Sequence, residues 1–308
     1  MNKIEIPDSL KKCSICPRIC GANRIYGHSG YCGTSTGFSI SSIFNHRGEE
    51  PVISGLRGIC NIFFTGCNLK CIYCQNYQIS RPAVPKNEMI LEEVTDRISE
   101  ILDTGINTVG FVSTSHVVPQ VIAIIHALHK MNLKPVIVYN TNSYERPEII
   151  RQLEGLVDVY LPDFKYISPE LAEKYSDAPD YPDFAVKAIK EMYRQKGSTL
   201  FTNDEGQAES GILIRHLVLP GHADESIKVL KFIAEEISTG IHLSLMSQYY
   251  PCDMAMGHPK IGRSLNKEEY ELVVKEMHRL GFRNGWVQGM ESFITYRPDF
   301  EKEEPFRE

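Results

Sequence analysis

The sequence predicts an α/β fold, a partial and open (β/α)6 barrel preceded by a small cysteine-rich segment. Three observations predict it. From residue 59 onwards, short apolar runs alternate with segments of helical periodicity. Strands that alternate with helices pair in parallel through right-handed crossovers, and six of them are too few to close an eight-stranded barrel. Residues 1–58, by contrast, carry little periodicity and many Cys, Gly, Arg and Ser residues.

Each predicted strand is a short apolar run bounded by polar or turn-forming residues. The first, ICNIFF, leads directly into a loop with three cysteines. In parallel β/α folds the chemistry lies at the carboxyl ends of the strands, so we expect polar residues that follow a strand to be functional. The predicted strands are residues 59–64, 107–112, 135–139, 156–161, 212–219 and 241–246.

The helices are predicted from apolar spacing and from their start and stop signals. Proline is tolerated at a first helical position, and Asn266 with Glu269 three residues later resembles a capping box. Glycines such as Gly105 and Gly281 provide stops. The predicted helices are 88–103, 119–131 and 147–155, two that start at Ser168-Pro169 and Tyr181-Pro182, then 224–237 and 266–281.

These patterns divide the chain into a cysteine-rich metal-binding segment, residues 1–58, and a barrel with a C-terminal extension, residues 59–308. The net charge is −6 and no run of Lys or Arg occurs, so nothing indicates a basic nucleic-acid surface. The N-terminus has no apolar signal core, and no stretch approaches the roughly 18 apolar residues of a membrane span. We expect a cytoplasmic protein that does not bind a membrane.

Cysteine usage points to metal binding. Eight of the nine cysteines fall in the first quarter of the chain. An odd number, tight clustering and the expected reducing compartment disfavour a disulfide framework.

The central motif is GCNLKCIYCQN, which spaces Cys67, Cys71 and Cys74 as C-x3-C-x2-C. A [4Fe–4S] cluster normally takes four thiolates, so three leave one iron open to a small molecule. That iron can chelate the amino and carboxylate groups of S-adenosylmethionine, and one-electron reduction then yields a 5′-deoxyadenosyl radical. The alternative is a structural zinc knuckle, which the spacing, the aromatic Tyr73 and the preceding strand disfavour.

A second set of four thiols lies in the N-terminal segment. Cys13, Cys16, Cys20 and Cys32 follow the spacing C-x2-C-x3-C-x11-C. Four thiolates suit tetrahedral zinc and also a complete second [4Fe–4S] cluster, and the spacing leaves both open.

At these motifs the sequence resembles the radical S-adenosylmethionine (radical SAM) superfamily. More narrowly, it resembles the pyruvate formate-lyase activating enzyme-related proteins that have a cysteine-rich N-terminal extension. The similar elements are CSICPRICGANR with GYCG, HRGEEPVISG, the cluster loop, TSHVVPQ, LPDFKY, RHLVLPGH and WVQ, which together cover most of the chain.

The resemblance implies which residues contact S-adenosylmethionine. Tyr73 corresponds to an aromatic residue near the adenine, and Lys165 of the Asp-x-Lys pattern to a partner of the methionine carboxylate. A purely structural ion pair between Asp163 and Lys165 is the alternative. The chain departs from the family pattern in two places. Ser113, Thr114, Ser115 and His116 replace a Gly-Gly-Glu segment, and Gln248 replaces a histidine. The remaining candidates at strand ends are Asn140, Asn142 and the anion-binding candidate Arg215.

The leading hypothesis is therefore a radical SAM oxidoreductase that abstracts hydrogen from a protein or peptide, as in glycyl-radical enzyme activation. A reductant such as flavodoxin or ferredoxin would supply the electron. Cys252 is a candidate hydrogen-atom donor, with an ordinary loop cysteine as the alternative. A second hypothesis directs the radical to a small molecule or RNA. A third is a non-catalytic iron–sulfur or zinc protein.

Overall fold

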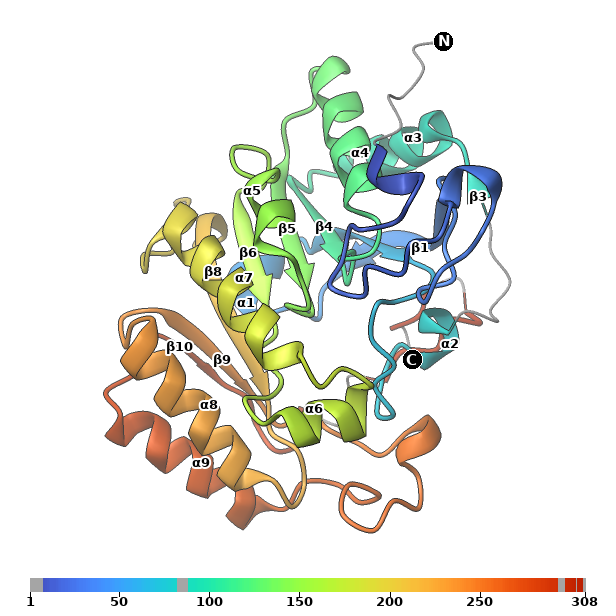
Figure 1. Ribbon diagram of the computed structural model, residues 1–308. Helices are drawn as coiled ribbons and strands as arrows, with labels where there is room; N and C mark the ends of the chain where they lie inside the picture. The colour runs from blue at the N-terminus through green and yellow to red at the C-terminus, as the bar shows by residue number, and fades with distance from the viewer. Residues whose placement is uncertain (1–7, 82–87, 293–296, 303, 307–308) are drawn as a thin grey trace.

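Seven parallel strands form the centre of the computed structural model, which describes residues 8–81, 88–292, 297–302 and 304–306 (Figure 1). The sheet order is β10-β9-β8-β6-β5-β4-β2-β1-β3, so the barrel stays open between its first and last strands. Every residue of β2 and β4 is buried, as expected for strands covered on both faces. The parallel strands are β2 Ile59–Phe64, β4 Thr108–Val112, β5 Val136–Thr141, β6 Val159–Pro162, β8 Ala208–Leu217, β9 His242–Met246 and β10 Gly285–Val287.

The six expected strands are present, and the α/β partial-barrel prediction is confirmed. The seventh parallel strand, β10, was not predicted because three residues are too short to show a pattern. Gly285 makes β10 possible: its φ is +119°, and a Cβ there would lie 2.0 Å from the carbonyl oxygen of Leu243. The other strands are antiparallel additions: β1 Phe38–His46 and β3 Glu88–Met89 at one edge, and β7 Phe201–Thr202 beside β8.

The longer helices lie on the outside of the curved sheet, with α3 and α4 beside β4 and with α8 and α9 beside β9 and β10 (Figure 1). The predicted capping box of α9 forms: Asn266 Oδ1 accepts from the Glu269 backbone N–H at 2.9 Å. The helices are α1 Pro51–Ser54, α2 Tyr77–Ser80, α3 Leu91–Leu102, α4 Val118–Lys130, α5 Pro147–Arg151, α6 Pro169–Ser176, α7 Tyr181–Lys196, α8 Ala223–Glu236 and α9 Lys267–Arg279. Single 3-10 turns occur at Asp8–Leu10, Arg24–Tyr26 and Asp253–Ala255. None of the described helices is long and apolar enough to cross a membrane.

The sheet continues into the segment that was expected to be dominated by loops. Strand β1 pairs with β2 along its length, from Ile40 opposite Phe64 to His46 opposite Ile59. Residues 38–58 thus contain a strand and the short helix α1, whereas the loop-rich part ends near Gly37. The division at residue 58 stays a prediction, although hydrogen-bonded strands cross it.

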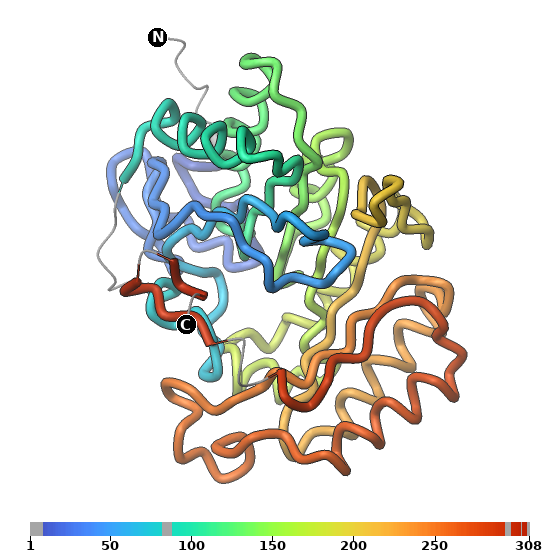
Figure 2. Tube along the Cα trace, turned by 180° about the vertical axis from the view of Figure 1, so that it is seen from behind, coloured from blue at the N-terminus to red at the C-terminus, as the bar shows by residue number. Residues whose placement is uncertain are grey.

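Because β1 runs antiparallel to β2, the connection between them lies at the amino ends of the parallel strands. In Figure 2, which views the molecule from behind, this connection lies on the viewer's side of the sheet. Val52 and Ile53 of α1 pack with Val138, Leu161 and Leu213. Helix α1 therefore fills the end of the barrel opposite the cysteine loop.

The C-terminal residues 297–302 and 304–306 return to the first strands of the barrel (Figure 2). Phe300 and Phe306 pack with Phe44 and Phe63, and the ring centroids of Phe63 and Phe300 are 5.3 Å apart. We call these two stretches, 297–302 and 304–306, the C-terminal strap.

Candidate active site

A cavity of about 400 Å³ opens inside the barrel. Cys71 and Cys74 lie on its wall at the carboxyl end of β2, and Glu49 and Glu50 line it from the connection between β1 and β2. Seven residues predicted from the sequence also line it: Tyr73, Ser113, Asn140, Asp163, Lys165, Arg215 and Gln248.

The cysteine loop begins directly after β2. Gly66 has a φ of +81°, and the loop then turns so that the thiols of Cys67, Cys71 and Cys74 are half-buried. Each sulfur is close to a donor. Cys67 Sγ accepts from the Leu69 backbone N–H at 3.4 Å, Cys71 Sγ lies 3.0 Å from Ser176 Oγ, and Cys74 Sγ lies 3.5 Å from Ser80 Oγ.

Burial raises the pKa of Cys67 to about 12, with the neighbouring Cys71 as the next cause. A buried thiol of this kind ionises only when a cation compensates the thiolate, as a bound metal centre does. Three half-buried sulfurs with hydrogen-bond donors therefore fit the thiolate ligands of an iron–sulfur cluster.

A network of charges lies beside the cysteine loop. Asp163 bonds Lys165 Nζ at 2.6 Å and Arg215 Nε at 2.8 Å. Arg215 also reaches Glu49 Oε2 at 3.1 Å and Asn140 Oδ1 at 2.6 Å. Burial opposes ionisation of Asp163, yet Arg215 and Lys165 outweigh it and lower the pKa of this carboxyl. Asp163 is therefore a carboxylate that holds two cations at the cavity.

Only the first residue of the serine, threonine and histidine segment after β4 reaches the cavity. Ser113 lines it with a φ of +54°, whereas Thr114, Ser115 and His116 are buried. The His116 ring bonds the Thr65 carbonyl oxygen at 3.0 Å, which joins the segment to the base of the cysteine loop.

Asn142 is hydrogen-bonded to the cysteine loop. Its Nδ2 donates to Asn68 Oδ1 at 2.8 Å and lies 3.6 Å from Cys67 Sγ, while its Oδ1 accepts from Ser115 Oγ at 3.2 Å. The amide thus links the loop after β4 to the residues around Cys67.

Tyr73 and Gln248 both line the cavity. The Tyr73 hydroxyl bonds the Tyr166 hydroxyl, and burial raises the pKa of Tyr73 well above its usual value. Gln248 Oε1 accepts from Gln288 at 2.8 Å, and its carbonyl oxygen accepts from Gln75 at 3.2 Å. A chain of three amides therefore occupies the place where the resemblance suggested a histidine.

Cys252 lies beside the cysteine loop. It is buried, and its Sγ donates to the Cys74 carbonyl oxygen at 3.4 Å. It is absent from the residues that line the cavity, and its role as a hydrogen-atom donor stays a prediction.

The N-terminal cysteines form a second group. Cys13, Cys16 and Cys32 are buried, and Cys20 is exposed. Among the described residues, no three His, Cys, Asp or Glu side chains gather as the ligands of one metal ion do.

Sequence reasoning missed several residues of the cavity. Glu49 and Glu50 lie in HRGEEPVISG, a segment that supported the resemblance without suggesting a role, because they precede the first strand of the barrel. Glu50 Oε2 is buried and has no hydrogen-bond partner among the described residues, and burial raises the pKa of this carboxyl. Trp286 and Gln288 reach the cavity from β10 and the residue after it, and no sequence signal marks them beyond the WVQ motif.

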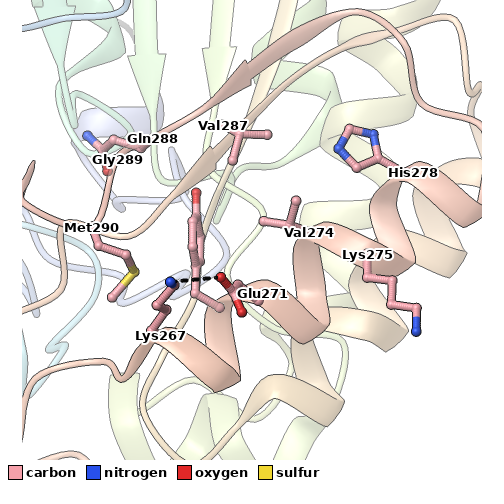
Figure 3. A pocket seen from close by; sticks show the side chains of 10 residues that line it. Lys267, Glu271, Val274, Lys275, His278, Val287, Gln288, Gly289 and Met290 are labelled. Carbon is pink, nitrogen blue, oxygen red and sulfur yellow. Dashed lines mark ion pairs between the residues drawn. The ribbon is translucent and has the colours of Figure 1, made fainter.

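A second groove, of about 630 Å³, lies between α9 and β10 (Figure 3). Lys267 and Glu271, both on α9, form an ion pair at 3.5 Å beside it, and Val274 and Met290 line it (Figure 3). Its lining contains no cysteine and no carboxylate besides Glu271. We therefore place the chemistry in the barrel cavity.

The comparisons with known proteins agree with this geometry. Residues 61–233 match the Radical SAM superfamily. An uncharacterized protein of Methanocaldococcus jannaschii is 31% identical over 284 residues, which cover 89% of this chain and 76% of the relative.

Two solved structures show the same fold. The FeFe-hydrogenase maturase HydG from Carboxydothermus hydrogenoformans has a TM-score of 0.51 at 14% identity, covering 72% of this chain and 50% of its own. SuiB from Streptococcus suis, solved with bound S-adenosylmethionine, has a TM-score of 0.50 at 14% identity, covering 75% and 50%. The chain thus spans about half the length of these structures. The match over more than half of this chain settles its family: the protein belongs to the radical SAM superfamily.

Proposed function

We propose that Cys67, Cys71 and Cys74 hold a [4Fe–4S] cluster and that S-adenosylmethionine binds in the barrel cavity. The observation that carries this proposal is the shared cavity: Cys71 and Cys74 face the same space as the charged network of Asp163 and Lys165. When bound, the cluster and S-adenosylmethionine supply reductive cleavage of a carbon–sulfur bond and a 5′-deoxyadenosyl radical.

The chain's own residues would position the methionine part of the cofactor. Lys165 supplies a point charge for the carboxylate, and Asp163 holds that ammonium group in place at 2.6 Å. Ser113, at the carboxyl end of β4, offers its hydroxyl and backbone to the amine. Asn142 and His116 act indirectly, since both are buried and hold the segments around Cys67.

Other residues would hold the rest of the cofactor. Tyr73 offers a ring edge near the adenine, fixed by its bond to Tyr166. Gln248 replaces a charged or ionisable contact by a neutral amide that Gln288 orients at 2.8 Å. Asn140 and Arg215 lie deeper, toward Glu49, and are placed to bind polar groups of a substrate.

We infer that the substrate is a protein or peptide, as in an activating enzyme. The cavity of about 400 Å³ lies near the lower end of small-molecule sites, which run from about 300 to 1000 Å³. S-adenosylmethionine would fill much of it. A substrate would then present only a short segment, such as one residue of a loop, to the radical.

One observation favours a small molecule instead. Phe306 of the C-terminal strap lines the cavity and lies 4.3 Å from the His46 ring, centroid to centroid. Phe306 thus forms part of the cavity wall, which would favour a small substrate over a folded one.

The remaining proposals concern partners and a second centre. A one-electron donor of the flavodoxin or ferredoxin type would reduce the cluster. Cys13, Cys16, Cys20 and Cys32 would hold a second metal centre, zinc or iron–sulfur.

Hydrogen transfer distinguishes the substrate classes. The reconstituted protein is incubated without oxygen with a reductant, S-adenosylmethionine and candidate substrates carrying deuterium on carbon. Deuterium in 5′-deoxyadenosine with glycine-containing peptides or proteins, but not with small molecules, would support the activating-enzyme proposal. Transfer from small molecules alone would contradict it.

A further inference from the structure

A row of hydrogen bonds runs from the wall of the cavity to the sulfur of Cys71. Tyr73 lines the cavity, and its hydroxyl bonds the Tyr166 hydroxyl. Tyr166 Oη lies 3.1 Å from Ser176 Oγ, which lies 3.0 Å from Cys71 Sγ. The three side chains that carry these hydroxyls are buried. The row therefore joins the space proposed for S-adenosylmethionine to one proposed ligand of the cluster.

The end of α6 holds Ser176 against the cysteine loop. The last carbonyl oxygens of a helix have no partner within the helix. Here the loop supplies partners: the Ile72 N–H donates to the Tyr175 carbonyl oxygen at 2.9 Å, and the Lys70 N–H donates to that of Ser176 at 3.2 Å. Both neighbours of Cys71 in the chain are thus bonded to α6. These backbone bonds place the Cys71 sulfur beside the Ser176 hydroxyl independently of the side-chain contact.

The chemistry of the groups determines the direction of these bonds. A hydroxyl carries one hydrogen, whereas a thiolate can only accept. With Cys71 as a thiolate ligand, the Ser176 hydroxyl donates to the sulfur. Its oxygen is then left to accept from Tyr166, and the Tyr166 oxygen accepts from Tyr73. Burial raises the pKa of Tyr166 well above its ordinary value, so this residue stays a neutral phenol that can donate.

The contact at Cys71 is the closest of those to the three thiols of the loop among the described residues. Its sulfur lies 3.0 Å from Ser176 Oγ, whereas the two other thiols lie 3.4 Å from a backbone N–H and 3.5 Å from a serine hydroxyl. The donor to Cys71 is also supported by two buried phenols. Hydrogen bonds in such a chain polarise and strengthen one another. We therefore expect Ser176 to be the strongest hydroxyl donor to this loop.

A hydrogen bond to a thiolate ligand changes how readily a cluster takes up an electron. Hydrogen bonds to the sulfurs are among the factors that set the reduction potential of an iron–sulfur cluster. Reduction adds one negative charge, so a donated hydrogen stabilises the reduced state more than the oxidised state. The low dielectric of a buried site strengthens this effect. A donor held beside Cys71 should therefore raise the midpoint potential.

We propose that Ser176 donates a hydrogen bond to the Cys71 thiolate, supported by Tyr166 and Tyr73, and that this row raises the midpoint potential of the cluster on the cysteine loop. Ser176 and Tyr166 are positioning residues, which act through Cys71. The inference rests on the proposed function, since it requires that cluster. In the step concerned, one electron passes from an external reductant to the cluster, which changes from the 2+ to the 1+ state. No covalent bond in the row breaks.

The midpoint potential of Ser176→Ala tests this directly. The full chain is reconstituted anaerobically and titrated with a reductant while its electron paramagnetic resonance signal is followed. The cluster on the cysteine loop is identified by the part of the signal that changes when S-adenosylmethionine is added. At a fixed potential we expect the ratio of reduced to oxidised cluster to fall about tenfold, as for the loss of a hydrogen bond to a charged group. For a one-electron couple this is a shift of about 59 mV to lower potential.

Ser226→Ala is the matched control. Ser226 is also buried, but it belongs to α8 and its hydroxyl lies 2.8 Å from His216 Nε2. We expect this variant to keep the potential of the unchanged protein, whatever it loses in stability. Equal potentials for Ser176→Ala and Ser226→Ala, at equal iron and sulfide content, would overturn the proposal.

The tyrosines give a second test that leaves Ser176 in place. Tyr166→Phe removes the hydroxyl behind Ser176 and should lower the potential, by less than Ser176→Ala does. Tyr175→Phe is its control, because Tyr175 is equally buried on α6 but its hydroxyl lies 2.8 Å from His222 Nε2. If Ser176→Ala binds no cluster, this pair decides alone. Equal potentials for the two tyrosine variants would contradict a row that acts on Cys71.

Failure of the inference and failure of the proposed function give different results. If the reconstituted unchanged protein shows no signal that responds to S-adenosylmethionine, the proposed function fails and the inference fails with it. If the signal responds but Ser176→Ala and Tyr166→Phe keep the potential of the unchanged protein, the proposed function stands and the inference alone is overturned. A lower potential in both variants, with both controls unchanged, would support it.

Discussion

Substitution of Asp163 by asparagine tests the charged network that borders the cavity. Asp163 bonds both Lys165 and Arg215, and the three side chains are only 13–19% exposed. Asp163→Asn leaves two cations facing a neutral amide. Removing one partner of a buried ion pair costs about 3–5 kcal/mol.

The lower end of that range applies here, because Arg215 keeps Glu49 at 3.1 Å and Asn140 at 2.6 Å. We expect the free energy of unfolding to fall by about 3 kcal/mol, a roughly 100-fold change in the unfolding equilibrium. Urea unfolding under anaerobic conditions measures it. With a slope near 3 kcal/mol per molar, the midpoint should fall by about 1 M.

Glu236→Gln is the matched control. It breaks the Lys190–Glu236 pair, whose atoms are 2.9 Å apart but whose side chains are 43% and 53% exposed. An exposed pair contributes at most about 1 kcal/mol. Equal losses for Asp163→Asn and Glu236→Gln would refute the view that Asp163 compensates two partly desolvated cations.

The same variant predicts a pH dependence. The pKa of Asp163 is lowered from its ordinary value of 3.8 by Arg215 and Lys165, which outweigh burial. A carboxyl with a lowered folded-state pKa stabilises the fold above its unfolded pKa, and this stabilisation is lost as the pH falls through the folded-state value. The difference in stability between the unchanged protein and Asp163→Asn should therefore stay constant above about pH 4 and shrink below it. A difference that grows on acidification would contradict the assignment.

Two further substitutions test separate features. One is the contact of the cysteine loop with the N-terminal segment, and the other is the buried Glu50 carboxyl in the cavity. Gly66→Ala and Gly155→Ala share the left-handed backbone strain, which costs roughly 1–2 kcal/mol in each variant. Gly66→Ala should lose more stability than that, because its Cβ would lie 2.3 Å from the Cys32 carbonyl oxygen, whereas a Cβ at Gly155 meets nothing within 4 Å. Equal losses in urea unfolding would show that the contact is unimportant. Burial raises the pKa of Glu50 above its ordinary 4.5, so its contribution to stability is present below that value and is lost as the pH rises through the folded-state pKa. The stability of Glu50→Gln relative to the unchanged protein should rise from pH 4.5 to 8, and a pH-independent difference would rule out a buried acid.

Much of the barrel could be predicted from the sequence because most of its strands are buried along most of their length. A mostly apolar run such as ICNIFF fits a buried strand and not an exposed loop, and β2 occupies residues 59–64 as predicted. The starts of several helices could be predicted from a proline at the first helical position or, for α9, from the capping box at Asn266. Proline lacks a backbone N–H that would be unpaired there, and the capping box supplies a partner for one. Strand β10 could not be found this way, because it is three residues long and depends on the approach of Gly285 to Leu243.

The site was predictable where functional residues follow strands along the chain. Asp163 and Lys165 follow β6 and Arg215 lies in the neighbouring strand β8, so the parallel sheet brings the three side chains together. Glu49 could not be placed from the sequence, because it reaches the cavity from the connection between β1 and β2, at the amino ends of the parallel strands. Local sequence also could not separate Ser113, which faces the cavity, from Ser115, which is buried two residues later.

The most direct test of the account is the formation of 5′-deoxyadenosine. Unchanged protein with a full complement of iron and sulfide is incubated anaerobically with dithionite and S-adenosylmethionine, alongside Cys71→Ala with its N-terminal cysteines intact. The account predicts 5′-deoxyadenosine and methionine in equal amounts from the unchanged protein and none from the variant. A fully loaded protein that leaves S-adenosylmethionine intact, or a Cys71→Ala variant that cleaves it equally well, would contradict the assignment of Cys67, Cys71 and Cys74.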